Sequence, residues 1–158
     1  MRNRRGLIAG IILFLTLAAV GIAFFLGQPR LTDQQQLYAL VAQAQRAVEN
    51  RNSAGLTRLI SRDYADPYGT NRQQLVGMIV QWLRGGEEVL AVPEITGLSV
   101  RGDFADLPLR VRLWPGREPS GPGEAYGMTL RLRKEGRHWR VISAEGWAEA
   151  QSDVMSGE

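Results

Sequence analysis

The stretch LPLRVRLW, residues 107–114, alternates leucine and valine with other side chains along most of its length. Successive side chains of a β-strand point to opposite faces, so this period predicts a strand with one buried face. MTLRLR, residues 128–133, shows the same alternation. The loop PGREPSGPG, residues 115–123, cannot continue either element, because proline lacks a backbone donor and glycine loosens the backbone. The two stretches therefore predict a long antiparallel hairpin.

Further strand signals flank this hairpin. The turn at residues 134–137 leads into a strand through Trp139 and Val141, and residues 89–92 and 98–101 can supply one or two more strands. The second half of the chain is thus expected to form an antiparallel meander.

The segment before residue 89 has a helical period instead. Thr32 and Gln35 form a capping box, which marks the start of a first helix. A short second helix is expected after Ser53, and a third, opened by Thr70, ends at Gly85. The apolar stripe of the first helix consists of Leu37, Leu40, Val41, Ala44, Ala47 and Val48. Helices followed by strands predict an α+β domain with helices packed on one face of a curved antiparallel sheet.

The N-terminal region has the composition of a membrane span. No side chain in residues 6–27 is charged, and at 1.5 Å rise per residue a helix of that length spans roughly 33 Å, enough for a hydrocarbon core. The alternative is a cleavable signal peptide, which has a shorter apolar run that ends in small residues. Because this run ends in Phe24-Phe25-Leu26, the sequence favours an uncleaved transmembrane helix.

Basic residues fix the expected orientation. Three arginines lie within residues 1–5, and only Arg30 follows the span closely, so the positive-inside rule places the N-terminus in the cytoplasm. We expect a single-pass protein of the inner or cytoplasmic membrane whose C-terminal domain is periplasmic or extracellular. The expected order is a basic cytoplasmic tail (1–5), a transmembrane helix (6–27), a linker (28–31), an α+β domain (32–149) and a flexible tail (150–158).

Composition argues against several classes of function. The chain has no cysteine and a single histidine, His138, which argues against disulfides, thiolate catalysis and the usual metal sites. The net charge of +3 comes entirely from the N-terminal arginines, so the domain lacks the basic excess of a nucleic-acid binder. We therefore expect no cofactor, no metal and no nucleic-acid partner.

Two short segments carry a family resemblance. DYADPYG at residues 63–69 and KEGRHWRV at residues 134–141, with the order of elements, resemble a membrane-anchored bacterial member of the nuclear transport factor 2-like superfamily over residues 32–149. The resemblance implies a cone-shaped sheet with a pocket on its concave face and Trp139 packed inside. Such cones serve isomerisation, dehydration or cyclisation in some members and protein binding in others. Membrane-anchored members include scaffold subunits of type IV secretion machines and proteins associated with lipid import.

Pocket candidates follow from this resemblance, because its enzymes place an acid and a tyrosine inside the cone as a general base and its partner. The strand positions that the alternation points inward hold only leucine, valine and methionine. The alternative for Asp63 and Asp66 is a structural role, because aspartates beside a proline such as Pro67 commonly form turns. Strict strand alternation points Glu145 inward, but a bulge at Gly146 can reverse this direction. The pocket candidates are Asp63, Tyr64, Asp66, Tyr68 and Glu145.

The outward positions of the two long strands are rich in arginine. A basic sheet face can meet anionic lipid headgroups or an acidic partner; the alternative is a solvated face with cross-strand ion pairs. The surface candidates are Arg110, Arg112, Arg131 and Arg133. On the same grounds Trp114 is expected to be exposed, and Trp82, Trp139 and Trp147 to lie in the core.

These features favour a non-catalytic scaffold, protein-interaction or ligand-binding module of an envelope complex. Its partner is an envelope protein or a second copy of the chain. The alternative is a pocket enzyme, or a carrier of small hydrophobic ligands, that uses Asp63 or Asp66.

Overall fold

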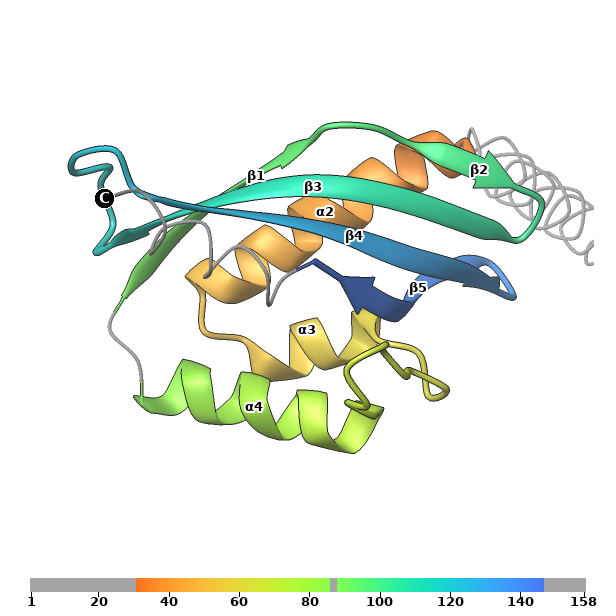
Figure 1. Ribbon diagram of the computed structural model, residues 1–158, viewed down its shortest axis with the longest axis horizontal. Helices are drawn as coiled ribbons and strands as arrows, with labels where there is room; N and C mark the ends of the chain where they lie inside the picture. Colours follow the sequence, from red (N-terminus) through yellow and green to blue (C-terminus); the bar gives the residue numbers. More distant parts are fainter. Residues whose placement is uncertain (1–30, 86–87, 147–158) are drawn as a thin grey trace, which may run out of the picture. The chain divides into compact units, whose positions relative to one another are not determined.

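The computed structural model describes residues 31–85 and 88–146, and those from Thr32 onward belong to one compact unit. Helices precede strands, as predicted (Figure 1). The elements are α2 (Asp33–Glu49), α3 (Ser53–Leu59), α4 (Arg72–Gly85), β1 (Val89–Ile95), β2 (Ser99–Arg101), β3 (Phe104–Pro115), β4 (Glu124–Glu135) and β5 (His138–Glu145).

The predicted basic tail, transmembrane helix and C-terminal tail lie outside the described residues. Residues 31–85 and 88–146 contain no helix that is long and apolar enough to cross a membrane.

The strands form one antiparallel sheet in the order β1-β3-β4-β5, with β2 beside β3. Its core is the predicted hairpin of β3 and β4, in which Leu107 pairs with Leu130 and Leu109 with Met128. Residues that pair directly lie on the same face of the sheet, so these two pairs face the helices. Arg110 and Arg112, which alternate with the inward residues along β3, face outward. The sheet curves around α2, and α3 and α4 lie on the same side (Figure 1). The predicted α+β architecture is confirmed.

Asparagine, rather than serine or threonine, caps the second and third helices. The predicted capping box of α2 is present, with the Gln35 amide donating to Thr32 Oγ1 at 3.2 Å. For α3 the cap is Asn52, one residue before the predicted Ser53. The box before α4 is formed by Asn71 and Gln74, at 3.0 Å and 2.9 Å. It is shifted by one residue because the amide of Thr70 donates to Asp66 instead.

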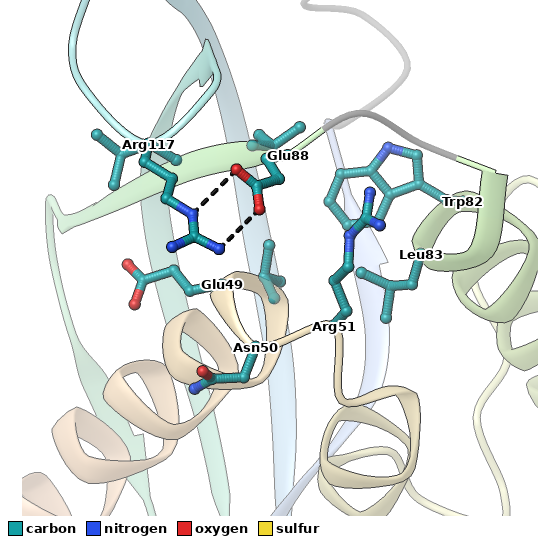
Figure 2. A pocket seen from close by; sticks show the side chains of 10 residues that line it. Glu49, Asn50, Arg51, Trp82, Leu83, Glu88 and Arg117 are labelled. Atoms are coloured by element: carbon teal, nitrogen blue, oxygen red, sulfur yellow. Dashed lines mark hydrogen bonds and ion pairs between the residues drawn. The ribbon is translucent and has the colours of Figure 1, made fainter.

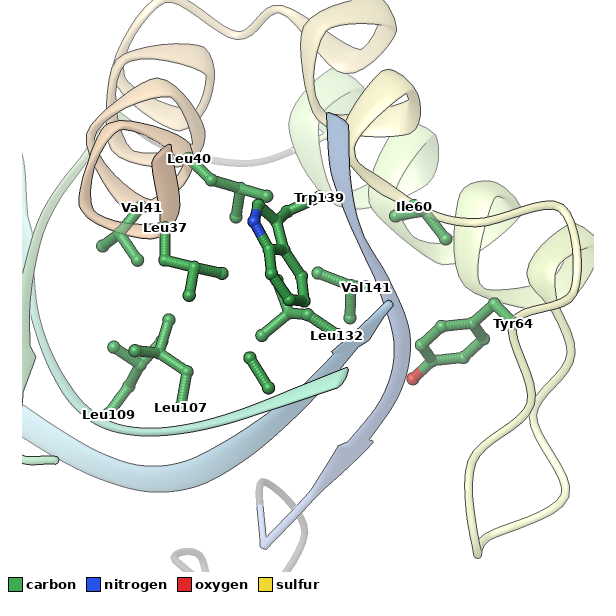
Figure 3. Packing of buried hydrophobic residues seen from close by; sticks show 11 residues of the cluster. Leu37, Leu40, Val41, Ile60, Tyr64, Leu107, Leu109, Leu132, Trp139 and Val141 are labelled. Carbon is green, nitrogen blue, oxygen red and sulfur yellow. The ribbon is translucent and has the colours of Figure 1, made fainter. Parts of the chain in front are cut away.

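Apolar side chains fill the space between α2 and the sheet. Leu37 of α2, Leu107 of β3 and Leu132 of β4 have no exposed surface, and Trp139 of β5 is 4% exposed. Figure 3 shows Leu37 and Leu40 pointing toward these strand residues. At roughly 25 cal/mol per Å² of buried apolar surface, this interior is the main source of the domain's stability. The predicted burial of Trp139 is confirmed.

Two other tryptophan predictions were wrong. Trp114 is only 8% exposed although it faces away from α2, because the hairpin tip folds over it and its indole N–H donates to the carbonyl of Gly121 at 3.2 Å. The guanidinium of Arg112 lies 5.8 Å from the Trp114 ring centroid. Conversely, Trp82 at the end of α4 is 44% exposed. Trp147 lies outside the described residues.

The segment after α3 covers the edge of β5. Ile60 forms a parallel bridge with Val141, and the amides of Ser61 and Ala65 donate to β5 carbonyls at 2.9 Å and 3.0 Å. Figure 3 shows Ile60 and Tyr64 beside this strand. Covering an edge satisfies backbone groups that could otherwise pair with another chain.

Candidate functional site

Asp66 forms the centre of a tight turn. Its Oδ1 accepts hydrogen bonds from the amides of Tyr68 and Thr70 at 3.0 Å and 2.8 Å, and its Oδ2 accepts one from the Tyr64 hydroxyl at 3.1 Å. The carboxylate is buried, with 8% of the residue exposed. A carboxylate that accepts this many hydrogen bonds holds the turn together and has little capacity left for a substrate proton.

Tyr64 is part of the core. It is 3% exposed, and burial, with the nearby charge and hydrogen bond of Asp66, raises the pKa of its hydroxyl well above the ordinary value of 10.0. Tyr64 therefore stays protonated as the donor to Asp66.

Asp63 lies outside this turn, in an ion-pair network on the surface. Its carboxylate binds Arg133 at 2.7 Å and its side chain is 71% exposed. Arg133 also binds Glu135 at 2.8 Å, and the Ser61 hydroxyl donates to Glu135 at 2.6 Å. The Ser61 hydrogen bond and Arg133 lower the pKa of Glu135. This network links the segment after α3 to the end of β4.

Glu145 faces outward because of a bulge within β5. Val141 pairs with Leu132 and Ser143 with Arg131, so Ile142 is an extra residue that reverses the alternation. The expected reversal therefore occurs before Glu145 and not at Gly146. Glu145 then lies opposite Thr129, on the face away from α2.

Three sequence candidates meet in one outer groove. The groove has a volume of about 640 Å³, and Tyr68, Arg110 and Glu145 line it together with Pro108 and Thr129. The Tyr68 hydroxyl accepts a hydrogen bond from the Gly146 amide at 2.9 Å, which ties the Asp66 turn to the end of β5. Asp63, Tyr64 and Asp66 do not line this groove.

The four arginines predicted to form a basic sheet face differ in their partners. Arg131 binds Asp106 at 3.3 Å, and Arg133 has the partners described above. Arg112 lies over Trp114, and Arg110 stands across from Glu94 of β1 in the sheet. Exposed pairs of this kind add little stability. The strand end nearest the α2 N-terminus is thus largely neutralised.

A second cavity, of about 560 Å³, lies where α2, α4, β1 and the β3–β4 hairpin tip approach each other (Figure 2). Its size is typical of small-molecule sites. Its apolar lining consists of Val48, Trp82, Leu83, Val89 and Leu90, and its polar lining of Glu49, Asn50, Arg51, Glu88 and Arg117.

The polar side of this cavity contains a two-bond ion pair. Arg117 donates from Nε and Nη2 to the two carboxylate oxygens of Glu88, at 2.9 Å and 2.7 Å. The hydrogen bonds and charge of Arg117, assisted by Arg51, lower the pKa of Glu88. Arg51 has a φ of 52°, a strained value for a residue with a side chain, at the exit from α2.

Sequence reasoning did not predict this cavity. Its residues come from four separate segments, and the helical phase of Trp82 indicated burial. Asn50 ends α2 and precedes Arg51, the residue with the unusual backbone angle. Neither residue type indicates a pocket when only the sequence is known.

The second cavity offers both ionisable and apolar side chains to a ligand. In the part of the chain that the structure describes, no group of three or more acidic, histidine or cysteine side chains could hold a metal ion. The ionisable side chains of the second cavity are two glutamates and two arginines, a set that can orient a polar ligand beside an apolar wall.

A curved antiparallel sheet with helices packed on it is the architecture of the nuclear transport factor 2-like, or cystatin-like, fold. No family model matches the sequence, and no curated protein matches it. Solved structures do match. A protein of unknown function from Nostoc punctiforme, with a cystatin-like fold, is 13% identical with a TM-score of 0.59, covering 73% of this chain and 91% of that one.

A nuclear transport factor 2-like protein from Cytophaga hutchinsonii is 12% identical with a TM-score of 0.58, covering 72% and 96% of the two chains. A putative calcium/calmodulin-dependent protein kinase type II association domain from Thiobacillus denitrificans is 18% identical with a TM-score of 0.59, covering 68% and 90%. At such identities these structures confirm the expected fold and carry no activity over to this chain.

Proposed function

We propose that this chain is a single-pass, membrane-anchored binding module of an envelope complex, with its domain outside the cytoplasm and without catalytic activity. The observation that carries the proposal is the filled cone. Leu37, Leu107 and Leu132 have no exposed surface where an enzyme of this fold would hold its substrate.

The acidic candidates support the same proposal. Asp66 accepts two amide hydrogen bonds and one hydroxyl hydrogen bond, and Asp63 is an exposed partner of Arg133. A general base needs a free lone pair directed at a substrate proton inside a pocket. The alternative is a pocket enzyme or carrier that uses Asp63 or Asp66, but neither residue lines either of the two cavities described above.

Two surfaces remain for binding. They are the outer groove at Tyr68, Arg110 and Glu145 and the cavity closed on one side by the Arg117–Glu88 pair. The Thiobacillus denitrificans structure is named as an association domain, which supports interaction as a use of this fold. The uncharged run of residues 6–27 and the arginines before it support the anchor.

The test is photo-crosslinking of the full chain in native membranes. A photoreactive residue replaces Arg110, which is exposed and lines the outer groove, and a matched variant carries it at exposed Gln73 on α4. We expect a defined protein adduct from position 110 and not from position 73, identified by mass spectrometry. Two differently tagged copies of the chain distinguish self-association from an envelope partner. Equal, diffuse adducts from both positions would contradict the proposal.

A further inference from the structure

A third, smaller cavity lies between α2 and α3, which follow each other across a short turn (Figure 1). Its volume of about 290 Å³ suits a small ion or a small organic molecule better than a drug-sized ligand. Two arginines from different helices and three amide side chains supply its polar lining, which consists of Arg46, Arg58, Gln43, Asn50 and Asn52. No carboxylate lines this cavity. The charge that it presents is therefore positive.

The two arginines of this cavity have no acidic partner among residues 31–85 and 88–146. The ion pairs within that part of the chain involve other cations, and neither Arg46 nor Arg58 takes part in one. Arg46 donates from Nε to the carbonyl of Ala42 at 3.2 Å, which leaves its two terminal nitrogens for a ligand.

The surrounding sequence is basic as well. Residues 43–62 contain four arginines and one acidic residue, Glu49. Glu49 lines the cavity of Figure 2 instead, and its carboxylate accepts a hydrogen bond from the Gln45 amide at 2.9 Å. The smaller cavity thus keeps its positive charge.

The acceptors at the end of α2 are already hydrogen-bonded. The carbonyl of Arg46 accepts from the backbone and side-chain amides of Asn50 at 3.0 Å and 2.8 Å, and the carbonyl of Ala47 accepts from the backbone amide of Asn52 at 2.7 Å. The side-chain oxygen of Asn52 accepts from the Gly55 amide at 2.9 Å. The side-chain nitrogen of Asn52 is therefore left as a donor.

Gly55 makes room for this donor. A Cβ at position 55 would lie 2.9 Å from Nδ2 of Asn52 and 3.3 Å from the Cβ of Ala47. Any larger residue would force the Asn52 amide to move, so the absence of a side chain at Gly55 keeps both the cavity and the position of its amide donor.

We propose that this cavity binds a phosphate group, held by the guanidinium groups of Arg46 and Arg58 and by the side-chain amide of Asn52. Arginine matches the oxygens of a phosphate with charge-assisted hydrogen bonds. A tetrahedral anion also offers more oxygens than a carboxylate to donors that come from two helices. The inference goes beyond the proposed function, because it needs neither the anchor nor a protein partner.

Calorimetric titration of the purified full chain in neutral detergent tests the ligand class. The probes are inorganic phosphate and glycerol phosphate, and we expect saturable binding with a Kd on the order of 1 mM or lower. Tighter binding of glycerol phosphate would identify a phosphate ester as the ligand, and equal binding would identify the free anion. Both results support the phosphate site, whereas a lack of saturable binding for both probes would overturn it.

Competition distinguishes a tetrahedral anion from a carboxylate. We expect sulfate to displace the bound phosphate and acetate at the same concentration to leave it in place. Equal displacement by sulfate and acetate would overturn the assignment to a phosphate group.

Substitution of single arginines tests the site itself. Arg46, Arg58 and Arg84 all lie in the last turn of their helices, but Arg84 on α4 does not line this cavity. We expect Arg46→Gln and Arg58→Gln each to weaken phosphate binding about tenfold or more, and Arg84→Gln, the matched control, to leave it unchanged. Equal losses in the three variants would show a diffuse effect of charge and would overturn the proposal, as would unchanged binding in all three.

Nuclear magnetic resonance of the unmodified chain gives a readout that does not depend on the folding of any variant. We expect phosphate to shift the side-chain resonances of Asn52, Arg46 and Arg58 with the same concentration dependence as the calorimetric titration. The Arg84 side-chain resonance should stay in place. Saturable binding without shifts at the first three side chains would place the phosphate elsewhere and overturn the proposal.

Discussion

At the scale of single residues, Asp66 and Asp63 show how one residue type serves two roles three positions apart. Asp66 is buried and accepts three hydrogen bonds, whereas Asp63 is exposed and binds one arginine. The difference lies in the direction of the backbone, because the turn points the Asp66 side chain toward the amides of Tyr68 and Thr70.

This difference predicts unequal effects of truncation. Asp66→Ala leaves two amides and a buried hydroxyl without an acceptor, and we expect it to lower the free energy of unfolding by about 2–3 kcal/mol. Asp63→Ala, the matched control, should cause little change because the Arg133 pair is exposed. Urea denaturation of both variants measures the effect. Similar losses for the two would contradict the assigned role of Asp66.

Tyr64 predicts a pH dependence at the alkaline end. Its pKa is raised in the folded state above the ordinary 10.0, so the stability it contributes is complete below pH 10 and is lost as the pH rises further. One such group changes the free energy of unfolding by at most about 1.4 kcal/mol per pH unit. We expect Tyr64→Phe to be less stable at pH 8 and to lose stability less steeply above pH 10. Parallel curves for the two proteins would show that Tyr64 does not cause the loss.

At the scale of elements, the N-terminus of α2 is fastened to the sheet by one carboxylate. The hydrogen bond from Lys134, followed by that from Trp139, lowers the pKa of Asp33 below 3.8. Because the pKa is lowered, the stability that Asp33 contributes is present above pH 3.8 and is lost as the pH falls through the folded-state pKa. We expect Asp33→Asn to have a lower free energy of unfolding than wild type at pH 7. The difference between the two free energies should narrow below pH 3.8. Denaturant titrations across this range measure it, with Glu118→Gln in the exposed tip as the control.

The β3–β4 hairpin tip depends on a glycine next to Trp114. Gly123 has a φ of 68°, and a Cβ there would lie 2.6 Å from the indole ring. We expect Gly123→Ala to cost about 2–4 kcal/mol, from the left-handed backbone and the forced movement of Trp114. Gly116 has a φ of 85° and open space where a Cβ would lie. For Gly116→Ala we therefore expect only the backbone cost of the left-handed conformation, about 1–2 kcal/mol. Tryptophan fluorescence during unfolding compares them, and equal costs would argue against the tip packing on Trp114.

At the scale of the whole molecule, the proposed topology predicts the compartment of the C-terminal domain. A reporter enzyme that is active only outside the cytoplasm, fused after residue 158, should be active. Replacing the three arginines of residues 1–5 with glutamate should reduce that activity, because the positive-inside bias is removed. A cytoplasmic reporter fused at the same point is the control. Its activity with the wild-type arginines would contradict the topology.

Short-range patterns were sufficient for the architecture. The alternation in residues 107–114 and 128–133 and the capping box at Thr32 depend on neighbours a few positions away, so the hairpin and the start of α2 could be predicted. The same reasoning placed Trp139 in the core, where strand phase and burial agree.

Side-chain environments depended on contacts between distant segments and could not be predicted in this way. Trp114 is buried by a loop tip that follows it, Trp82 is exposed because it borders a cavity, and the bulge at Ile142 decides the direction of Glu145. The cavity of Figure 2 combines residues 48–51 with residues 82–83, residues 88–90 and Arg117. Backbone hydrogen bonding and apolar period are local properties of the chain, whereas burial, cavities and charge pairing arise when remote segments pack together.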